Sequence, residues 1–409
     1  MRTLTPDTLN GGHGVPASGA EGCFEVYYNG TDIIGTEESD LVTYPLPIGI
    51  TGSPKQTVVT LASTPFVIPP TFFGMHSQDT ALESITYGAW RNLSAFVDWC
   101  YIETSDNGYD AGQLTKLDAM IAKCVAQGRD VVWCFANTPT WASRTPASVD
   151  PAYTNGSAWT PANFANLTRF INTLLTRYPG QIQDGEGWNE PNDTALYYKD
   201  TLANLVTHQQ TIWNAVQAHN TATGRSIKVI SPSFTGAGGT NQGPINLDAF
   251  LAAGGGAYCD IIGHHPYGMG NGQGLFIDRT VLQLAKSTMA TRGLSAKGFM
   301  VTEGGDSVIT NYTRDRFVRQ MLFAAALGAV KFCWYSYDIP GIQDMRIQTK
   351  AATAWNDAVT YLSGKTIGWV NYSRGIRSSE TWWTAGIPLR SAGWDGWASG
   401  FRSRSICGG

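Results

Sequence analysis

Two patterns of hydrophobic positions alternate along the chain between residues 70 and 362. Short runs rich in β-branched and aromatic residues, typical of buried strands, are separated by longer segments with apolar residues at helical spacing, such as Leu117, Met120, Ile121 and Cys124. Eight strand-like runs are expected, at residues 71–75, 87–91, 130–135, 182–189, 227–231, 258–265, 297–302 and 329–336. Strands that alternate with helices predict a parallel α/β architecture, and eight of them favour a closed (β/α)8 TIM barrel.

The same pattern divides the chain into three parts. Residues 1–68 contain many turn residues and only short β-like runs, so they are interpreted as an N-terminal extension or small β module. Residues 69–362 are expected to form the barrel. After residue 362 the periodicity fades, and residues 363–409 predict a short C-terminal accessory segment that could contribute β strands.

Charged residues are scarce, at 15% of the 409 positions, whereas an average soluble domain has roughly 25%. Aromatic residues reach 11%, which excludes intrinsic disorder. The net charge of −4, without a basic run, argues against nucleic acid as a partner. The longest apolar run, residues 321–330, is shorter than the ~20 residues that cross a bilayer, so no membrane partner is expected.

The N-terminal sequence, MRTLTPDTLNGGHG, lacks the apolar segment of a secretory signal peptide. The localisation therefore stays open between the cytoplasm, release by lysis or by export without a signal, and attachment to a phage particle. Seven cysteines without a C-x-x-C pair indicate buried free thiols and no disulfide framework.

Two glutamates stand at the ends of predicted strands. Glu190 follows the fourth strand in GEGWNEPND, and Glu303 ends the seventh in FMVTEGGD. Active sites of (β/α)8 barrels form at the C-terminal ends of the strands. An isolated Glu is more often a surface carboxylate, but Trp188 beside Glu190 and the apolar run into Glu303 favour the strand ends. Two carboxyl groups on this rim match glycoside hydrolysis, in which one is a general acid and the other a nucleophile or base.

Other chemistries lack their motifs. The chain has no H-E-x-x-H, no G-x-S-x-G, no P-loop and no G-x-G-x-x-G after a strand. His264 and His265 are adjacent, so in a regular strand they point to opposite sides and cannot both bind one metal ion. We therefore expect neither a metal nor a cofactor.

The motifs W-N-E-P-N at 188–192 and V-T-E-G-G at 301–305 resemble those of the retaining glycoside hydrolases of clan A. Over residues 70–362 the chain is most similar to glycoside hydrolase family 39 and its bacterial exopolysaccharide-hydrolase relatives. This resemblance implies that Glu190 is the acid/base and Glu303 the nucleophile. It also implies substrate-binding roles for Asn189, near the sugar 2-hydroxyl, for Trp334, as a platform under the sugar, and for Arg91, His265 and Tyr267.

Further candidates come from their places at strand ends. His76 ends the first strand and Trp141 follows the third, so both are candidate sugar ligands, although a structural role is about as common for such residues. Glu186 is interpreted as a buried structural acid rather than a catalytic one.

The sequence thus predicts a retaining glycoside hydrolase that acts on an oligo- or polysaccharide, endo-acting on a bacterial extracellular polysaccharide. Two alternatives stay open. One is an exo-acting β-xylosidase-like enzyme; the other is a carbohydrate-binding or attachment protein, on a surface or phage particle, that uses the same barrel. The sugar, the linkage and the oligomeric state are not predicted.

Overall fold

A computed structural model describes twelve segments of the chain: 21–28, 33–42, 57–78, 85–93, 97–236, 243–270, 274–277, 279–305, 314–338, 345–346, 351–376 and 405–407. These fall into two compact units. One contains Pro70–Ser307 and Ala329–Ile347; the other contains Met1–Pro69, Val308–Gly328 and Gln348–Gly409. Parts of both predicted terminal segments, including residues 1–20 and 377–404, lie outside the described residues.

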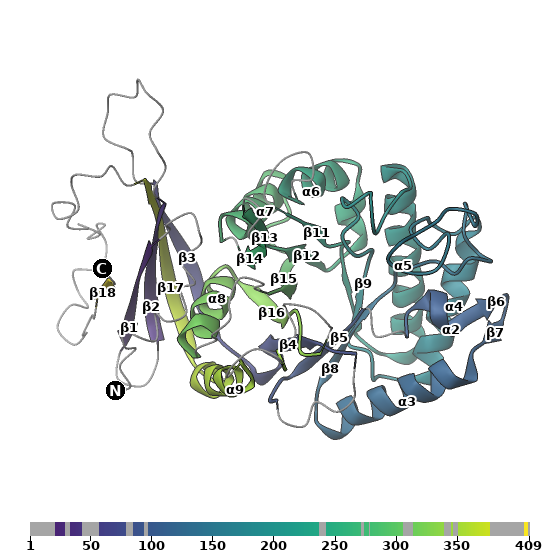
Figure 1. The fold of residues 1–409 in the computed structure, drawn as a ribbon, viewed down its shortest axis with the longest axis horizontal. Helices are drawn as coiled ribbons and strands as arrows, with labels where there is room; N and C mark the ends of the chain where they lie inside the picture. Colours follow the sequence, from purple (N-terminus) through teal and green to yellow (C-terminus); the bar gives the residue numbers. More distant parts are fainter. Residues whose placement is uncertain are drawn as a thin grey trace. The chain divides into compact units, whose positions relative to one another are not determined.

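The first unit contains a closed barrel of eight parallel strands, which confirms the predicted (β/α)8 fold (Figure 1). Neighbouring strands follow chain order, β16 pairs with β4, and the pairing of Ile230 with Ile261 joins β10 to β12. The strands are β4 (Phe73–His76), β5 (Ala89–Asn92), β8 (Asp130–Cys134), β9 (Asp184–Glu186), β10 (Lys228–Ile230), β12 (Ile261–His265), β15 (Gly298–Gly304) and β16 (Ala329–Trp334).

Helices alternate with these strands along the chain. Three of them begin at side-chain N-caps that accept a hydrogen bond from a backbone N–H: Asp110, Asn163 and Thr201. The helices are α3 (Ala111–Ala126), α4 (Phe164–Arg177), α5 (Leu202–Thr223), α6 (Gly243–Ala252), α7 (Arg279–Thr291), α8 (Arg314–Ala326) and α9 (Ala351–Leu362). By compactness α8 and α9 belong to the second unit.

The barrel interior changes from charged to apolar to charged along the strands. Near the starts of the strands Lys331 forms ion pairs with Asp184, at 2.5 Å, and Asp130, at 3.0 Å. An apolar layer follows, formed by Val132, Ile230, Ile261, Met300 and Cys333. Because side chains alternate along a strand, Lys331 and Cys333 share one side of β16, and Asp184 shares a side of β9 with Glu186. Glu186 therefore lies above the apolar layer, at the C-terminal rim.

Short elements that the periodicity does not predict lie before or after several strands of the barrel. They are η1 (Pro70–Phe72), α2 (Trp99–Ile102), the hairpin of β6 (Glu103–Ser105) and β7 (Gly108–Tyr109), β11 (Phe234–Thr235), η3 (Gly255–Tyr258), and the hairpin of β13 (Tyr267–Gly270) and β14 (Gly274–Ile277). Several of them lie in βα segments, where residues of barrel active sites are usually found.

The second unit contains a five-stranded sheet in the order β18–β1–β2–β17–β3. Its strands are β1 (Glu21–Tyr28), β2 (Ile33–Val42), β3 (Thr57–Val67), β17 (Thr366–Ile376) and β18 (Ser405–Cys407). β17 runs parallel to β2 and antiparallel to β3. Strands from both ends of the chain therefore form one sheet. The predicted division at residues 68 and 362 stays a prediction.

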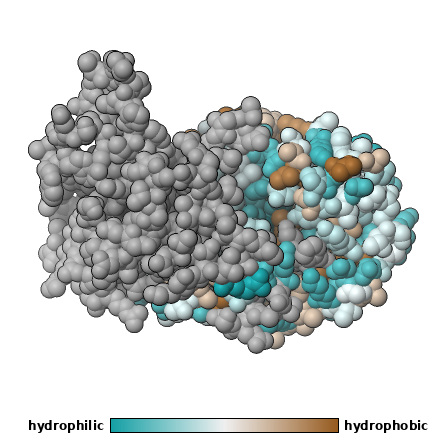
Figure 2. All heavy atoms as spheres, in the orientation of Figure 1, coloured by the Kyte–Doolittle hydropathy of each residue, from teal (hydrophilic) through white to brown (hydrophobic). Residues whose placement is uncertain are grey.

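Five cysteines of the unit that contains the barrel are buried free thiols: Cys100, Cys124, Cys134, Cys259 and Cys333. Where Figure 2 is coloured, the surface is mostly hydrophilic to neutral and the hydrophobic residues occur in small separate groups, as is usual for proteins in water. Among the described helices, none combines the length and the apolar character that a membrane span requires.

Candidate active site

Polar side chains meet where the strands of the barrel end. His76 ends β4, Arg91 lies on β5, Glu186 ends β9, His265 ends β12 and Glu303 lies near the end of β15. These residues are buried; Glu303 is the most exposed of them, at 7%. A group of charged residues can be buried only if its members bind one another, so their contacts define the site.

Arg91 is at the centre of these contacts. Its Nη1 donates to Glu303 Oε2 at 3.2 Å, and its Nη2 donates to Glu186 Oε1 and to Asn189 Oδ1, each at 2.9 Å. Nη1 also contacts His76 Nε2. Because a guanidinium only donates, His76 Nε2 must accept and the proton of the neutral ring lies on Nδ1. Burial lowers the pKa of His76 well below its ordinary value, which agrees with a neutral ring.

Glu186 also accepts a hydrogen bond from the Ser233 hydroxyl, which Thr302 in turn supports. Ser233 Oγ donates to Glu186 Oε1 at 2.6 Å and lies 2.6 Å from Thr302 Oγ1. A serine hydroxyl carries one proton, so Thr302 donates to Ser233. Gly263 permits this approach, since a Cβ at that position would clash with Ser233 Oγ. The Glu186 carboxylate thus binds Arg91 and Ser233. It positions Arg91 and is not free to react.

Glu190 lies in the turn that follows β9. Its φ of 44° is in the left-handed region, which is uncommon for a residue with a Cβ. Its backbone N–H donates to Ser233 O at 2.8 Å, and Asn189 pairs with Ser233 in an isolated bridge. The surrounding contacts therefore hold a strained conformation, a feature that is concentrated at functional sites.

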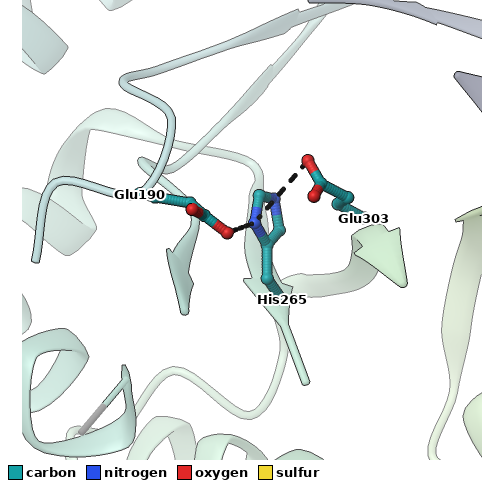
Figure 3. Close-up of side chains that lie close together, drawn as sticks. All are labelled: Glu190, His265 and Glu303. Atoms are coloured by element: carbon teal, nitrogen blue, oxygen red, sulfur yellow. Dashed lines mark hydrogen bonds and ion pairs between the residues drawn. The ribbon is translucent and has the colours of Figure 1, made fainter. Parts of the chain in front are cut away.

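His265 lies between the two candidate catalytic carboxylates (Figure 3). Its Nδ1 is 2.7 Å from Glu190 Oε1 and 3.9 Å from Glu303 Oε2. One ligand atom from each of the three residues lies within 4.8 Å of the other two, a spacing that a divalent cation could also use. Arg91 beside Glu303 places a fixed positive charge there, which disfavours a cation. The arrangement is thus better suited to two carboxyl groups acting on one substrate.

The two carboxyl groups differ in their electrostatic surroundings. Burial raises the pKa of Glu190 to about 7. Burial and the neighbouring Glu190 also raise the pKa of Glu303, and Arg91 and the Tyr267 hydroxyl oppose part of this rise. Burial lowers the pKa of His265 to about 4, so its ring is neutral at pH 7. Glu190 can therefore hold a proton near neutral pH, while Glu303 has donors that favour its ionised form.

Tyr267 supplies one of these donors. Its hydroxyl donates to Glu303 Oε1 at 3.1 Å, and its ring lies edge-on to that of His265 at 6.3 Å. Two donors from different strands, Tyr267 and Arg91, thus bind the two oxygens of Glu303. Of the residues singled out in the sequence, one connected network contains His76, Arg91, Asn189, Glu190, His265, Tyr267 and Glu303.

The two candidate tryptophans lie differently. Trp334 is 1% exposed and its ring stacks on Phe332 at 6.3 Å. Trp141 is half-buried; its indole N–H donates to Glu103 O at 2.7 Å and the Arg169 guanidinium lies 5.5 Å from its ring. These contacts do not join either ring to the network of Glu190 and Glu303, so their sugar-stacking roles stay predictions.

Other residues lie at the site besides the candidates at Glu190 and Glu303 and their sugar ligands. Tyr335 continues the side of β16 that carries Lys331 and Cys333, and its ring lies 5.3 Å from that of His76. Ser233 and Thr302 support Glu186. Counting the alternation from Lys331 could have pointed to Tyr335. No sequence signal distinguishes Ser233, since it follows a Ser-Pro pair beyond the end of a strand.

Comparisons with known proteins give likeness of structure only. No model of a known protein family matches the chain, and no curated protein sequence does. A monomeric β-xylosidase from Caulobacter crescentus CB15 superposes with a TM-score of 0.51 and 16% identity, covering 68% of this chain and 62% of that one.

Two further solved structures are more distant. A GH39 enzyme from Xanthomonas axonopodis pv. citri has a TM-score of 0.49 and 15% identity, covering 71% of this chain and 64% of that one. A GH30 endoxylanase from Clostridium papyrosolvens C71 has a TM-score of 0.48 and 12% identity, covering 75% and 76%. The chain thus spans under two thirds of the length of the first two proteins. The likeness to the β-xylosidase shows that this chain shares its fold.

Proposed function

We propose that this chain is a retaining glycoside hydrolase of the family 39 type, endo-acting on a bacterial extracellular polysaccharide. The observation that carries the proposal is the pair Glu190 and Glu303, with a carboxylate oxygen of each within 4.8 Å of the other. Retaining enzymes have carboxyl groups about 5–5.5 Å apart, whereas inverting enzymes need about 6.5–9.5 Å to admit a water molecule. The fold that the chain shares with a β-xylosidase supports the same class.

In the first step Glu303 attacks the anomeric carbon and forms a glycosyl ester. The bond from that carbon to the leaving oxygen breaks, and Glu190 gives its proton to this oxygen. The donors Arg91 and Tyr267 hold the Glu303 carboxylate in place for attack. Burial of Glu190 keeps it protonated near neutral pH, as a general acid requires.

In the second step the ionised Glu190 removes a proton from water. The water oxygen bonds to the anomeric carbon, the ester bond to Glu303 breaks, and the sugar leaves with retained configuration. Both enzyme groups then return to their starting state. No cofactor takes part in this scheme.

The remaining candidates are proposed to bind the sugar at the reaction centre. Asn189 uses its Oδ1 to accept from Arg91, which leaves its amide N–H₂ as the proposed donor to the sugar 2-hydroxyl. His76 and His265 are neutral and each offers one donor. Trp334 and Trp141 are retained as proposed stacking surfaces only.

The proposal is tested with a panel of purified polysaccharides, analysed for the sizes of the products. We expect a ladder of oligosaccharides from at least one polymer with the native chain, and none with Glu303→Gln or Glu190→Gln. Asp110→Asn is the matched control, because it also turns a carboxylate into an amide, but at an exposed N-cap where Asn caps equally well.

Each other outcome corrects a stated part of the proposal. Full activity in either glutamine variant contradicts the assignment of the pair. Release of monosaccharide alone rejects the endo-acting proposal in favour of an exo-acting enzyme. Binding of a polymer without any product favours a carbohydrate-binding or attachment protein.

A further inference from the structure

Three half-buried tyrosines, Tyr197, Tyr153 and Tyr101, form a row of rings. The ring centroids of Tyr197 and Tyr153 are 6.4 Å apart, and those of Tyr153 and Tyr101 are also 6.4 Å apart. The planes of neighbouring rings are inclined by 55° and 52°. Because each residue is only half-buried, part of this row is open to solvent.

The row crosses three successive segments on the catalytic rim of the barrel. Tyr101 lies in α2, after β5; Tyr153 lies in the segment after β8; Tyr197 lies in the segment after β9. β5, β8 and β9 are neighbours in the barrel, so their C-terminal segments are neighbours as well. These residues belong to the face on which the catalytic pair lies, not to the core.

Backbone hydrogen bonds hold the segment between Glu190 and Tyr197 in one conformation. Asp193 N donates to Glu190 O at 2.9 Å, and Tyr197 N donates to Asp193 O at 2.9 Å, so two turns separate the residues. The indole N–H of the fully buried Trp188 donates to Tyr197 O at 2.8 Å. Burial raises the pKa of Tyr197, and the charges of Glu190 and Glu303 raise it further. Tyr197 is therefore the member of the row nearest to Glu190 along the chain, and Tyr153 and Tyr101 lie beyond it.

The segments that carry the row are fixed before any ligand binds. Lys199 N donates to Ala158 O at 2.8 Å, and Lys199 Nζ binds Asp150 Oδ1 at 2.7 Å, which ties the segment of Tyr197 to that of Tyr153. Near Tyr101, the Trp99 ring stacks on Phe170 at 5.3 Å. Aromatic rings held in this way bind a ligand with little loss of conformational freedom.

We propose that Tyr197, Tyr153 and Tyr101 form a stacking surface for successive sugar units on the leaving-group side of the bond that is cleaved. A pyranose ring presents an apolar face of C–H groups, which packs against an aromatic face, and the phenol hydroxyls add hydrogen bonds at the edge. The spacing of the rings is comparable with the length of one sugar unit. The inclined planes require a polymer that turns as it follows the row.

The leaving-group side follows from the proposed function, on which this inference rests. The general acid protonates the leaving oxygen, so the sugar attached to that oxygen lies next to Glu190. Because Tyr197 is the member of the row nearest to Glu190 along the chain, the row is placed to bind units beyond the cleaved bond. Such a surface is of use to an enzyme that cleaves within a polymer, and of none to one whose substrate ends one unit beyond that bond.

The test measures binding and cleavage separately. In the Glu303→Gln background, the retardation of the protein is measured in gels that contain xylan, curdlan or xanthan. We expect at least one polymer to bind, Tyr153→Ala to weaken this binding about tenfold or more, and Tyr153→Phe to keep it, because the ring makes the contact. In the native background, Tyr153→Ala should lower kcat/KM for that polymer, with kcat/KM for a 4-nitrophenyl monosaccharide unchanged.

Tyr258→Ala is the matched control. Tyr258 is also half-buried, but it lies in η3, which leads into the start of β12 at the opposite end of the barrel. The inference is overturned if none of the polymers retards the protein, or if Tyr153→Ala binds as well as its parent. It is also overturned if Tyr258→Ala or Tyr153→Phe weakens binding of the polymer as much as Tyr153→Ala does. A polymer that binds through Tyr153 yet gives no product with the native chain contradicts the hydrolase and leaves the stacking surface standing.

Discussion

The hydroxyl of Tyr267 donates a hydrogen bond to Glu303 Oε1, across 3.1 Å. Tyr267 follows β12 and Glu303 lies on β15, so the contact joins neighbouring strands at the rim. A donor to a carboxylate stabilises its ionised form and lowers its pKa. The bond therefore both orients Glu303 and favours the state in which it can act as a nucleophile.

Tyr267→Phe removes this donor and little else. We expect kcat to fall about 10- to 100-fold, because a hydrogen bond to a charged group contributes about 1.5–3 kcal/mol. The pKa of Glu303 should rise, which moves the acidic limb of the pH profile to higher pH. The measurement is kcat/KM against pH for an aryl glycoside of the sugar that the panel identifies. An unchanged profile would mean that the hydroxyl does not act on Glu303.

The alkaline limb of a second kcat/KM profile, measured on a natural glycosidic bond whose leaving oxygen needs a proton, should report Glu190. Burial raises the pKa of this carboxyl to about 7, and a general acid works only while it is protonated. We therefore expect kcat/KM to fall as the pH rises through about 7. Glu190→Gln cannot titrate, so its residual activity should show no such limb. A limb that persists in Glu190→Gln would belong to another group.

The two glutamates should also differ in their dependence on the leaving group. Glu190→Gln should lower cleavage of a natural glycosidic bond by about 10²–10⁴, but much less for an aryl glycoside whose acidic phenol leaves without a proton. Glu303→Gln should abolish both reactions. Comparable losses on both substrates for both variants would contradict the separate roles. Asp110→Asn is the control, with activity equal to that of the native chain.

Lys331 provides a test of the barrel interior. Lys331→Met leaves Asp184 buried without its partner, so we expect the free energy of unfolding to fall by about 3–5 kcal/mol. Lys331→Met/Asp184→Asn removes the unpaired charge and should recover part of this loss. Urea unfolding followed by circular dichroism measures both. A loss below about 1 kcal/mol would mean that the pair behaves like an exposed one.

The strands could be predicted from sequence because buried parallel strands are short apolar runs between helical segments. The ends of the strands could not be predicted in the same way. The strand predicted at 182–189 is shorter in the structure, where β9 spans Asp184–Glu186. The chain then enters the turn in which Glu190 has a positive φ. The run at 227–231 is β10 over Lys228–Ile230, because Pro232 has no N–H to continue the ladder.

Within the site, the motifs located the two glutamates, but the sequence did not show which face of a strand points into the barrel. Glu190 and Glu303 stand out because polar residues end apolar runs. In contrast, residues on both faces of a barrel strand are buried, so the sequence V-K-F-C-W-Y does not show whether the side of Cys333 and Tyr335 or the side of Trp334 faces the barrel interior. The row of Tyr101, Tyr153 and Tyr197 depends on segments without periodicity, whose contacts only the structure shows.

The central claim is that Glu303 and Glu190 cleave a glycosidic bond by double displacement. It is tested most directly by proton NMR of the first sugar formed from the polymer that the panel identifies. We predict that the new reducing end first appears with the same anomeric configuration as the cleaved bond, and that Glu303→Gln gives no signal. First appearance of the opposite anomer would contradict the account.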